Sequence, residues 1–245
     1  SGLLDHAGRK TMGYHEAAVI GDELKRLAPV LEGTRPQARV AILLDYESRW
    51  ALQMQPHNAK LREAVDPEFV APNPATVVDV DPEGNVQHMT GRGWMGWPFL
   101  AAYIALWERK IPVAIVSPDS DLGAYELVLA PFLHLLRPEV VENLTQYVEQ
   151  GGNLVLGPRA GFKDDSNRLY PVPQPGPLRV VTGATVRFFD SLDLTRTNSI
   201  RWRHRPDARG TDIGMWAEVL DVDEGSGAEV VARYENGWYA GEVAI

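Results

Sequence analysis

The chain of 245 residues contains no cysteine. This absence excludes disulfides, thiolate-metal sites and a cysteine nucleophile. A chain without thiols suits a reducing compartment, and we expect a cytoplasmic protein. The chain therefore cannot have the activity of α/β enzymes that act through a cysteine at a strand end. It can still have the architecture of those enzymes.

Long apolar runs and an excess of basic residues are also lacking. No apolar stretch approaches the roughly 20 residues of a membrane span, and the first residues lack a basic segment followed by an apolar one. Acidic residues outnumber basic ones by 33 to 24, which gives a formal charge of −9. Nucleic acid and anionic membrane surfaces are disfavoured as partners, because like charges repel.

The sequence does contain enough apolar residues, 44%, for a substantial core. Residues 14–31 carry an apolar stripe with helical spacing, and Gly33 follows it. Continuous apolar runs at 38–46 and 111–116 are typical of strands covered on both faces.

A strand, helix, Gly-Gly and strand succession follows, in ELVLAP, LRPEVVENLTQYVEQ and GGNLVLGPR. Helical crossovers between strands indicate parallel pairing, and Gly151-Gly152 stands where a helix C-terminus favours a positive φ. We predict an α/β fold of the flavodoxin-like or class I glutamine amidotransferase-like type, a three-layer sandwich with a mainly parallel sheet. The expected strands are centred near Leu43, Ile115, Val128, Val155 and Val186.

Few residues suggest chemistry. Asp45 and Glu47 follow the first strand, where open α/β sheets bind ligands, but helix N-terminal charges with Glu47 or Ser48 as the cap explain them better. The six histidines show no metal-ligand spacing, and His134 in FLHLL reads as a packed side chain. GRG at 91–93 follows no strand, so a dinucleotide site is not indicated. We therefore assign no catalytic, metal or cofactor residues.

Other residues are candidates for subunit contact. A charged loop after a strand end can fix the register between subunits, and exposed aromatic side chains can anchor an interface. The alternative interpretations are that the charged loop is only solvated and that the two tryptophan side chains are buried beneath the following helix. The candidates are Trp94, Trp97, Arg159, Lys163 and Asp164.

Taken in order, these segments resemble the middle, trimerisation domain of family 42 β-galactosidases. The opening SGLLDHAGR and the helix YHEAAVIGDELKRL look like the end of that family's catalytic barrel. ARVAILLDYESRWAL, YVEQGGNLVLGPRAGFKDDSNRL, GPLRVVTGATV and GAEVVARYENGWYAGEVAI are similar to successive parts of the middle domain. Residues 55–97 show little resemblance beyond composition.

The resemblance implies a remnant of the barrel at 1–33 and a trimerisation domain at 34–245. It implies a parent enzyme, a homotrimer, that hydrolyses terminal β-D-galactosides with retention, using two carboxylates about 5–5.5 Å apart on a barrel upstream of Ser1. The β-galactoside would be bound by that barrel. On this reading the chain carries association and not bond cleavage. The alternatives are a separate amidotransferase-like α/β hydrolase and a small-molecule binding domain.

Overall fold

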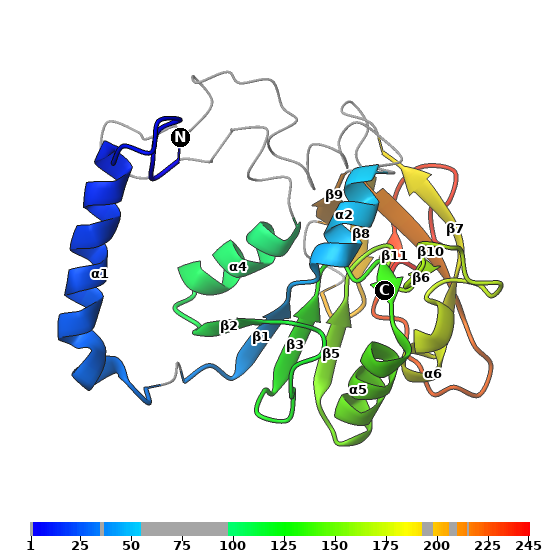
Figure 1. The fold of residues 1–245 in the computed structure, drawn as a ribbon. Helices are drawn as coiled ribbons and strands as arrows, with labels where there is room; N and C mark the ends of the chain where they lie inside the picture. Colours follow the sequence, from blue (N-terminus) through cyan, green and yellow to red (C-terminus); the bar gives the residue numbers. More distant parts are fainter. Residues whose placement is uncertain (1, 35–36, 55–97, 193–197, 206–209, 215) are drawn as a thin grey trace, which may run out of the picture. The chain divides into compact units, whose positions relative to one another are not determined.

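The computed structural model describes residues 2–34, 37–54, 98–192, 198–205, 210–214 and 216–245. The chain divides into two compact units, Ser1–Gln37 (unit 1) and Ala38–Ile245 (unit 2). Figure 1 shows their elements in chain order. The predicted candidates Trp94 and Trp97 lie outside the described residues.

Unit 1 is a loop followed by one long helix, α1 (Met12–Leu31). The predicted helix at 14–31 is confirmed, and Gly33 follows it with a φ of +80°. In the loop, Asp5 accepts hydrogen bonds from the backbone N–H groups of Ala7 and Arg9. The helix buries none of its residues, and its apolar side chains, among them Val19, Ile20 and Leu24, are exposed.

Unit 2 begins with a parallel sheet in the order β2-β1-β3-β5. Its strands are β1 (Val40–Leu43), β2 (Val113–Val116), β3 (Leu127–Ala130) and β5 (Asn153–Leu156). The associated helices are α2 (Tyr46–Met54), α4 (Pro98–Glu108) and α5 (Pro138–Glu149). Four of the five predicted strands and their parallel pairing are confirmed, since every neighbouring pair in this sheet is parallel.

One face of this sheet forms the main core with α5. The helix contributes Val140, Leu144 and Tyr147, which pack with Leu43 and Val128 of the strands. Gly151 follows α5 with a φ of +92°, as the Gly-Gly pair predicted. The core therefore lies between the helix and the two central strands.

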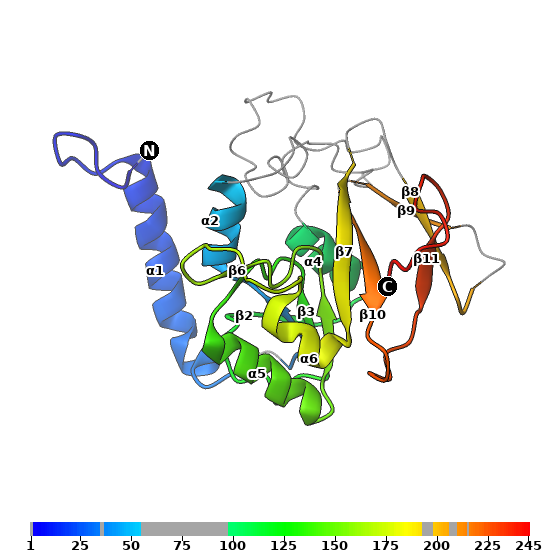
Figure 2. The same cartoon turned by 90° about the vertical axis from the view of Figure 1, so that its right-hand side faces the viewer.

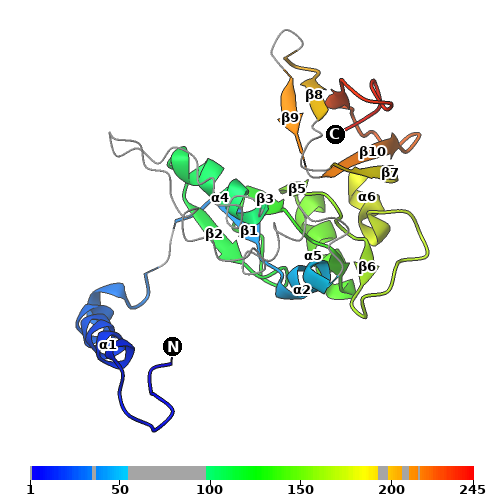
Figure 3. The same cartoon turned by 90° about the horizontal axis from the view of Figure 1, so that it is seen from above.

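The opposite face is covered in part. Figure 3 shows α4 on the side of the sheet away from α5, where it contacts β1 and β2. Within the described residues, Ile115 of β2 and Val155 of β5 are 49% and 52% exposed. Apolar parallel sheets are usually covered on both faces, so this face is less protected than the apolar strands led us to expect.

Short elements join the parallel sheet to the rest of unit 2. β4 (Leu135–Leu136) pairs in parallel with β6 (Lys163–Asp164). The 3-10 helix η3 (Gly176–Leu178) and the short helix α6 (Arg179–Thr182) follow. Leu178 is fully buried and belongs to the same core as α5.

The C-terminal part is antiparallel (Figures 1 and 2). β7 (Ala184–Ser191) pairs with β10 (Trp216–Val222), while β8 (Asn198–Trp202), β9 (Thr211–Ile213) and β11 (Ala232–Tyr234) form a sheet in the order β11-β8-β9. The predicted parallel strand near Val186 is therefore wrong, because β7 pairs antiparallel with β10. Its segment ATVRFFD mixes polar and apolar positions, as strands with one solvated face do.

Candidate functional site

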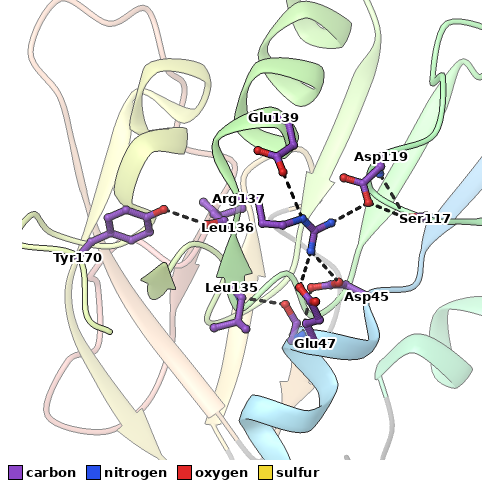
Figure 4. A network of polar contacts seen from close by, with 10 residues as sticks. Asp45, Glu47, Ser117, Asp119, Leu135, Leu136, Arg137, Glu139 and Tyr170 are labelled. Carbon is purple, nitrogen blue, oxygen red and sulfur yellow. Dashed lines mark hydrogen bonds and ion pairs between the residues drawn. The ribbon is translucent and has the colours of Figure 1, made fainter. Parts of the chain in front are cut away.

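At the carboxyl edge of the parallel sheet, four carboxylates surround the guanidinium of Arg137 (Figure 4). Nη1 lies 2.7 Å from Glu47 Oε2 and 3.7 Å from Asp45 Oδ1. Nη2 lies 2.7 Å from Asp119 Oδ2, and Nε lies 3.9 Å from Glu139 Oε1. We call these four carboxylates and Arg137 the acidic edge, because its formal charge is negative.

The topology brings these side chains together. Asp45 lies two residues after β1 and Asp119 three residues after β2, and neighbouring parallel strands end at the same edge. Arg137 stands between β4 and α5. Asp45 Oδ2 also accepts the Ser48 backbone N–H at 3.1 Å, which caps α2. The interpretation of Asp45 and Glu47 as helix N-terminal charges is confirmed, but the capping residue is Asp45 and not Glu47 or Ser48.

The electrostatics of the acidic edge favour an ionic cross-link. The hydrogen bond from Arg137 holds the pKa of Asp119 below its usual range, and the same bond raises the pKa of Arg137. A general acid or base works best with a pKa near the operating pH. Since Asp119 is shifted away from neutrality, this arrangement stabilises charge and does not prepare proton transfer by Asp119.

The hollow beside the acidic edge is nearly filled. It lies at the ends of β1 and β3 and is lined by residues that include Asp45, Phe99 and Pro131, with a volume of about 10 Å³. This is the position where doubly wound sheets hold ligands. A volume of this size admits about one water molecule. This hollow, as the described residues line it, therefore has no room for a small-molecule ligand.

Ser48 links this edge to β4. The side chain is fully buried, and its Oγ accepts the Leu135 backbone N–H at 2.8 Å. In the Ser48→Ala variant this buried N–H loses its partner, so we expect the free energy of unfolding to fall by about 1–3 kcal/mol. Urea unfolding of the chain measures the change. Ser166→Ala, at an exposed position, is the control and should change stability by about 0.5 kcal/mol or less. Equal effects at both serines would contradict the prediction.

Arg159 lies inside unit 2. The residue is 1% exposed, has a φ of +62°, and places its guanidinium 5.5 Å from the Phe162 ring centre and 5.1 Å from that of Trp216. Its three side-chain nitrogens have no hydrogen-bond partner in the part of the chain that the structure describes. Burial lowers the pKa of Arg159 to about 10. Aromatic faces are its principal neighbours, so cation-π attraction offsets part of the cost of burial.

Glu218 supplies the carboxylate that interacts with Arg159. Its Oε1 accepts the Arg159 backbone N–H at 2.9 Å, the Gln174 Nε2–H at 3.0 Å and the Trp216 Nε1–H at 2.9 Å. Burial raises the pKa of the Glu218 carboxyl. Arg159 follows β5, Gln174 precedes α6 and Trp216 belongs to β10. All three donate to the same oxygen of Glu218, which ties the parallel sheet to the antiparallel part. Sequence reasoning missed Glu218, because no motif in the sequence singles it out.

The remaining predicted contact residues form a local loop. Lys163 is 5% exposed and its Nζ donates to Asn167 Oδ1 at 2.9 Å. Asp164 accepts the Ser166 and Arg168 backbone N–H groups and forms an ion pair with Arg168 at 3.1 Å. Arg159 and Lys163 therefore face inward and only Asp164 reaches the surface. Their part in subunit contact stays a prediction. His134 is fully buried, as its apolar setting indicated.

The described residues of unit 2 also line two larger hollows. One, of about 790 Å³, lies between α6 and the turn after β10, and the charged residues Arg179 and Asp223 that line it are bound to each other. The other, of about 420 Å³, lies on β8 and β11 and is lined by Arg201, Arg203 and Arg233 with Trp202. Among the described helices, none is long and apolar enough to cross a membrane.

Comparison with known proteins matches residues 38–245 to the family model described as the β-galactosidase trimerisation domain. The matched range coincides with unit 2.

Relatives of known name agree with this match. The β-galactosidase BgaB of a Geobacillus species is 32% identical over 235 residues, which are 95% of this chain and 29% of BgaB. The structure of a catalytic mutant of Gan42B, a GH42 β-galactosidase from G. stearothermophilus, is 26% identical with a TM-score of 0.65, and the match covers 100% of this chain and 30% of that one. The β-galactosidase of Halorubrum lacusprofundi is 31% identical with a TM-score of 0.63, over 99% of this chain and 30% of that one. The chain thus spans less than a third of the length of these relatives. It belongs to the β-galactosidase trimerisation domain family.

Proposed function

We propose that this chain serves as the middle, non-catalytic part of a β-galactosidase and brings its subunits together as a homotrimer. The observation that carries the proposal is the family match over the whole of unit 2. The relatives are named β-galactosidases, and the chain corresponds to less than a third of each. The nearly filled hollow at the strand ends supports an associative role over ligand binding at that edge.

Unit 1 fits the proposed domain division, in which residues 1–33 are the end of a catalytic barrel and 34–245 the trimerisation domain. α1 exposes Val19, Ile20, Leu24 and Leu27 along one helix and buries none of its residues. A helix with an uncovered apolar stripe gains stability by packing on another surface. A barrel preceding the helix would supply that surface and would also hold the β-galactoside and the two catalytic carboxylates.

The proposed fold class for unit 2 is flavodoxin-like or class I glutamine amidotransferase-like. The strand order β2-β1-β3-β5 supports it, because the first crossover runs to one side of β1 and the later ones to the other. An amidotransferase-like enzyme would act through a cysteine on a strand-to-helix turn. This chain contains no cysteine, which agrees with an architecture kept for assembly.

The test compares the protein at its full natural length with the 245-residue chain. We expect the full-length protein to have the mass of a trimer in light scattering and to hydrolyse a chromogenic β-galactoside with retention, while the chain alone shows no turnover above background. A full-length protein that is monomeric at micromolar concentration would contradict the associative role. Turnover by the chain alone, abolished by substitution of one of its own carboxylates, would contradict the non-catalytic role.

A further inference from the structure

Three arginines share one face of the β8–β11 pair. Arg201 of β8 stands directly opposite Arg233 of β11 in the antiparallel register. Arg203 follows Arg201 by two residues, and alternate residues of an extended chain point to the same face. Together with Trp202, Val230 and Ala232 these arginines line the hollow of about 420 Å³, which we call the basic groove.

The positive charge of the basic groove is only partly compensated. Arg201 forms an ion pair with Glu235. Arg203 Nη1 lies 3.4 Å from Glu229 Oε2, and both of these side chains are exposed. Arg233 donates to the Gly241 carbonyl at 2.8 Å and contacts no carboxylate in the described part of the chain. Like charges directly opposite on neighbouring strands are unfavourable. An additional carboxylate placed at Arg233 would therefore stabilise the groove.

The acidic edge has the opposite imbalance, because its negative charges outnumber its positive charge. Its four carboxylates share one guanidinium, and the side chains of Glu47, Asp119 and Glu139 are exposed to water. Figures 2 and 3 both show the β8–β9–β11 sheet well apart from α2, whose first turn carries Glu47. The two surfaces therefore lie too far apart to meet within one copy.

We propose that the acidic edge of one copy of this chain docks into the basic groove of the next copy. The inference rests on the proposed trimeric association and identifies two of the surfaces that carry it. A contact between two different patches is heterologous, and repetition of such a contact by a rotation of one third of a turn closes a ring of three. Opposed surface charges of this kind set partner choice and register.

The test uses charge reversal in the full-length protein, with the trimer dissociation measured by analytical ultracentrifugation. Arg233→Glu and Glu139→Lys are each expected to weaken association about tenfold or more, since each places like charges in contact. The double variant restores opposite charges at every interface of the ring and is expected to recover most of the affinity. Lys110→Glu makes the same charge change as Arg233→Glu, at an exposed position outside both surfaces, and should leave association unchanged.

The outcomes separate the inference from the function on which it rests. A trimeric wild-type protein whose association ignores Arg233→Glu and Glu139→Lys would overturn the pairing and leave the associative role intact. Weakening by both single variants without recovery in the double variant would also overturn it. A monomeric wild-type protein would overturn the associative role itself. If circular dichroism shows that a reversal prevents folding, Arg233→Gln and Glu139→Gln replace it, with an expected weakening of about threefold each.

Discussion

We expect the Glu218→Ala variant to unfold with a free energy about 3–5 kcal/mol below that of the wild-type chain. The substitution removes the oxygen that accepts hydrogen bonds from Arg159, Gln174 and Trp216. Buried donors without a partner cost about 1–3 kcal/mol each. The fully buried Arg159 also loses the carboxylate that favours its charged form. Urea unfolding followed by tryptophan fluorescence measures the difference.

Glu218→Gln is the matched control. An amide oxygen can still accept these hydrogen bonds, so the loss should be clearly smaller than for alanine. A loss for alanine below about 1 kcal/mol, or equal losses for both variants, would contradict the role of Glu218 as the common acceptor.

The difference in stability between the wild type and Glu218→Gln should also depend on pH. Burial raises the pKa of Glu218 in the folded chain above its value in the unfolded chain. A group with this shift stabilises the fold below its unfolded pKa of about 4.3 and loses that contribution as the pH rises through the folded pKa. The stability of wild type relative to Glu218→Gln should therefore fall as the pH rises from about 4. A relative gain over that range would contradict the direction of the shift.

The sequence predicted the parallel part of the fold because its strands have a distinctive pattern. Apolar runs such as VAIL at β1 and LVLA at β3 are typical of strands inside a parallel sheet, and helical stripes separate them. The strand near Val186 was placed in the wrong kind of sheet. Its partner, β10, lies about thirty residues later, and a pairing over that separation depends on tertiary contacts that local pattern does not contain.

Side-chain partners were less predictable than strands. Asp45 and Glu47 were recognisable at a strand end, but Arg137, which holds them, comes about ninety residues later and stands in a helix-like stretch. Arg159 and Lys163 read as surface charges because charged residues are rarely buried. The structure places Arg159 against the rings of Phe162 and Trp216, and Lys163 lies within β6. The burial of Arg159 depends on Trp216 of β10, which is about sixty residues away in the sequence.

Gly157→Ala is expected to destabilise the chain by about 3 kcal/mol, since overpacking at a close backbone contact forces the backbone to shift. Gly157 follows β5, and its N–H donates to the Ala130 carbonyl at 2.9 Å. A Cβ at this position would lie 2.1 Å from the Pro131 carbonyl oxygen and 2.7 Å from its carbonyl carbon. Both are backbone atoms and cannot rotate away, so the ends of β3 and β5 have to separate. The loop after Pro131 leads to β4 and Arg137, and the acidic edge should therefore loosen with it.

Gly123→Ala is the matched control for Gly157→Ala, because it makes the same chemical change in a turn of the same unit. The nearest atom to a Cβ at Gly123 is Asp121 Oδ1 at 3.3 Å, which belongs to a side chain that can move. A glycine replaced without strain changes stability by less than about 1 kcal/mol, because alanine reduces the freedom of the unfolded chain. Urea unfolding of the two variants decides the matter. If Gly157→Ala is as stable as Gly123→Ala, the close approach of β5 to Pro131 does not constrain the fold, and the carboxyl edge of the sheet tolerates more separation than these contacts imply.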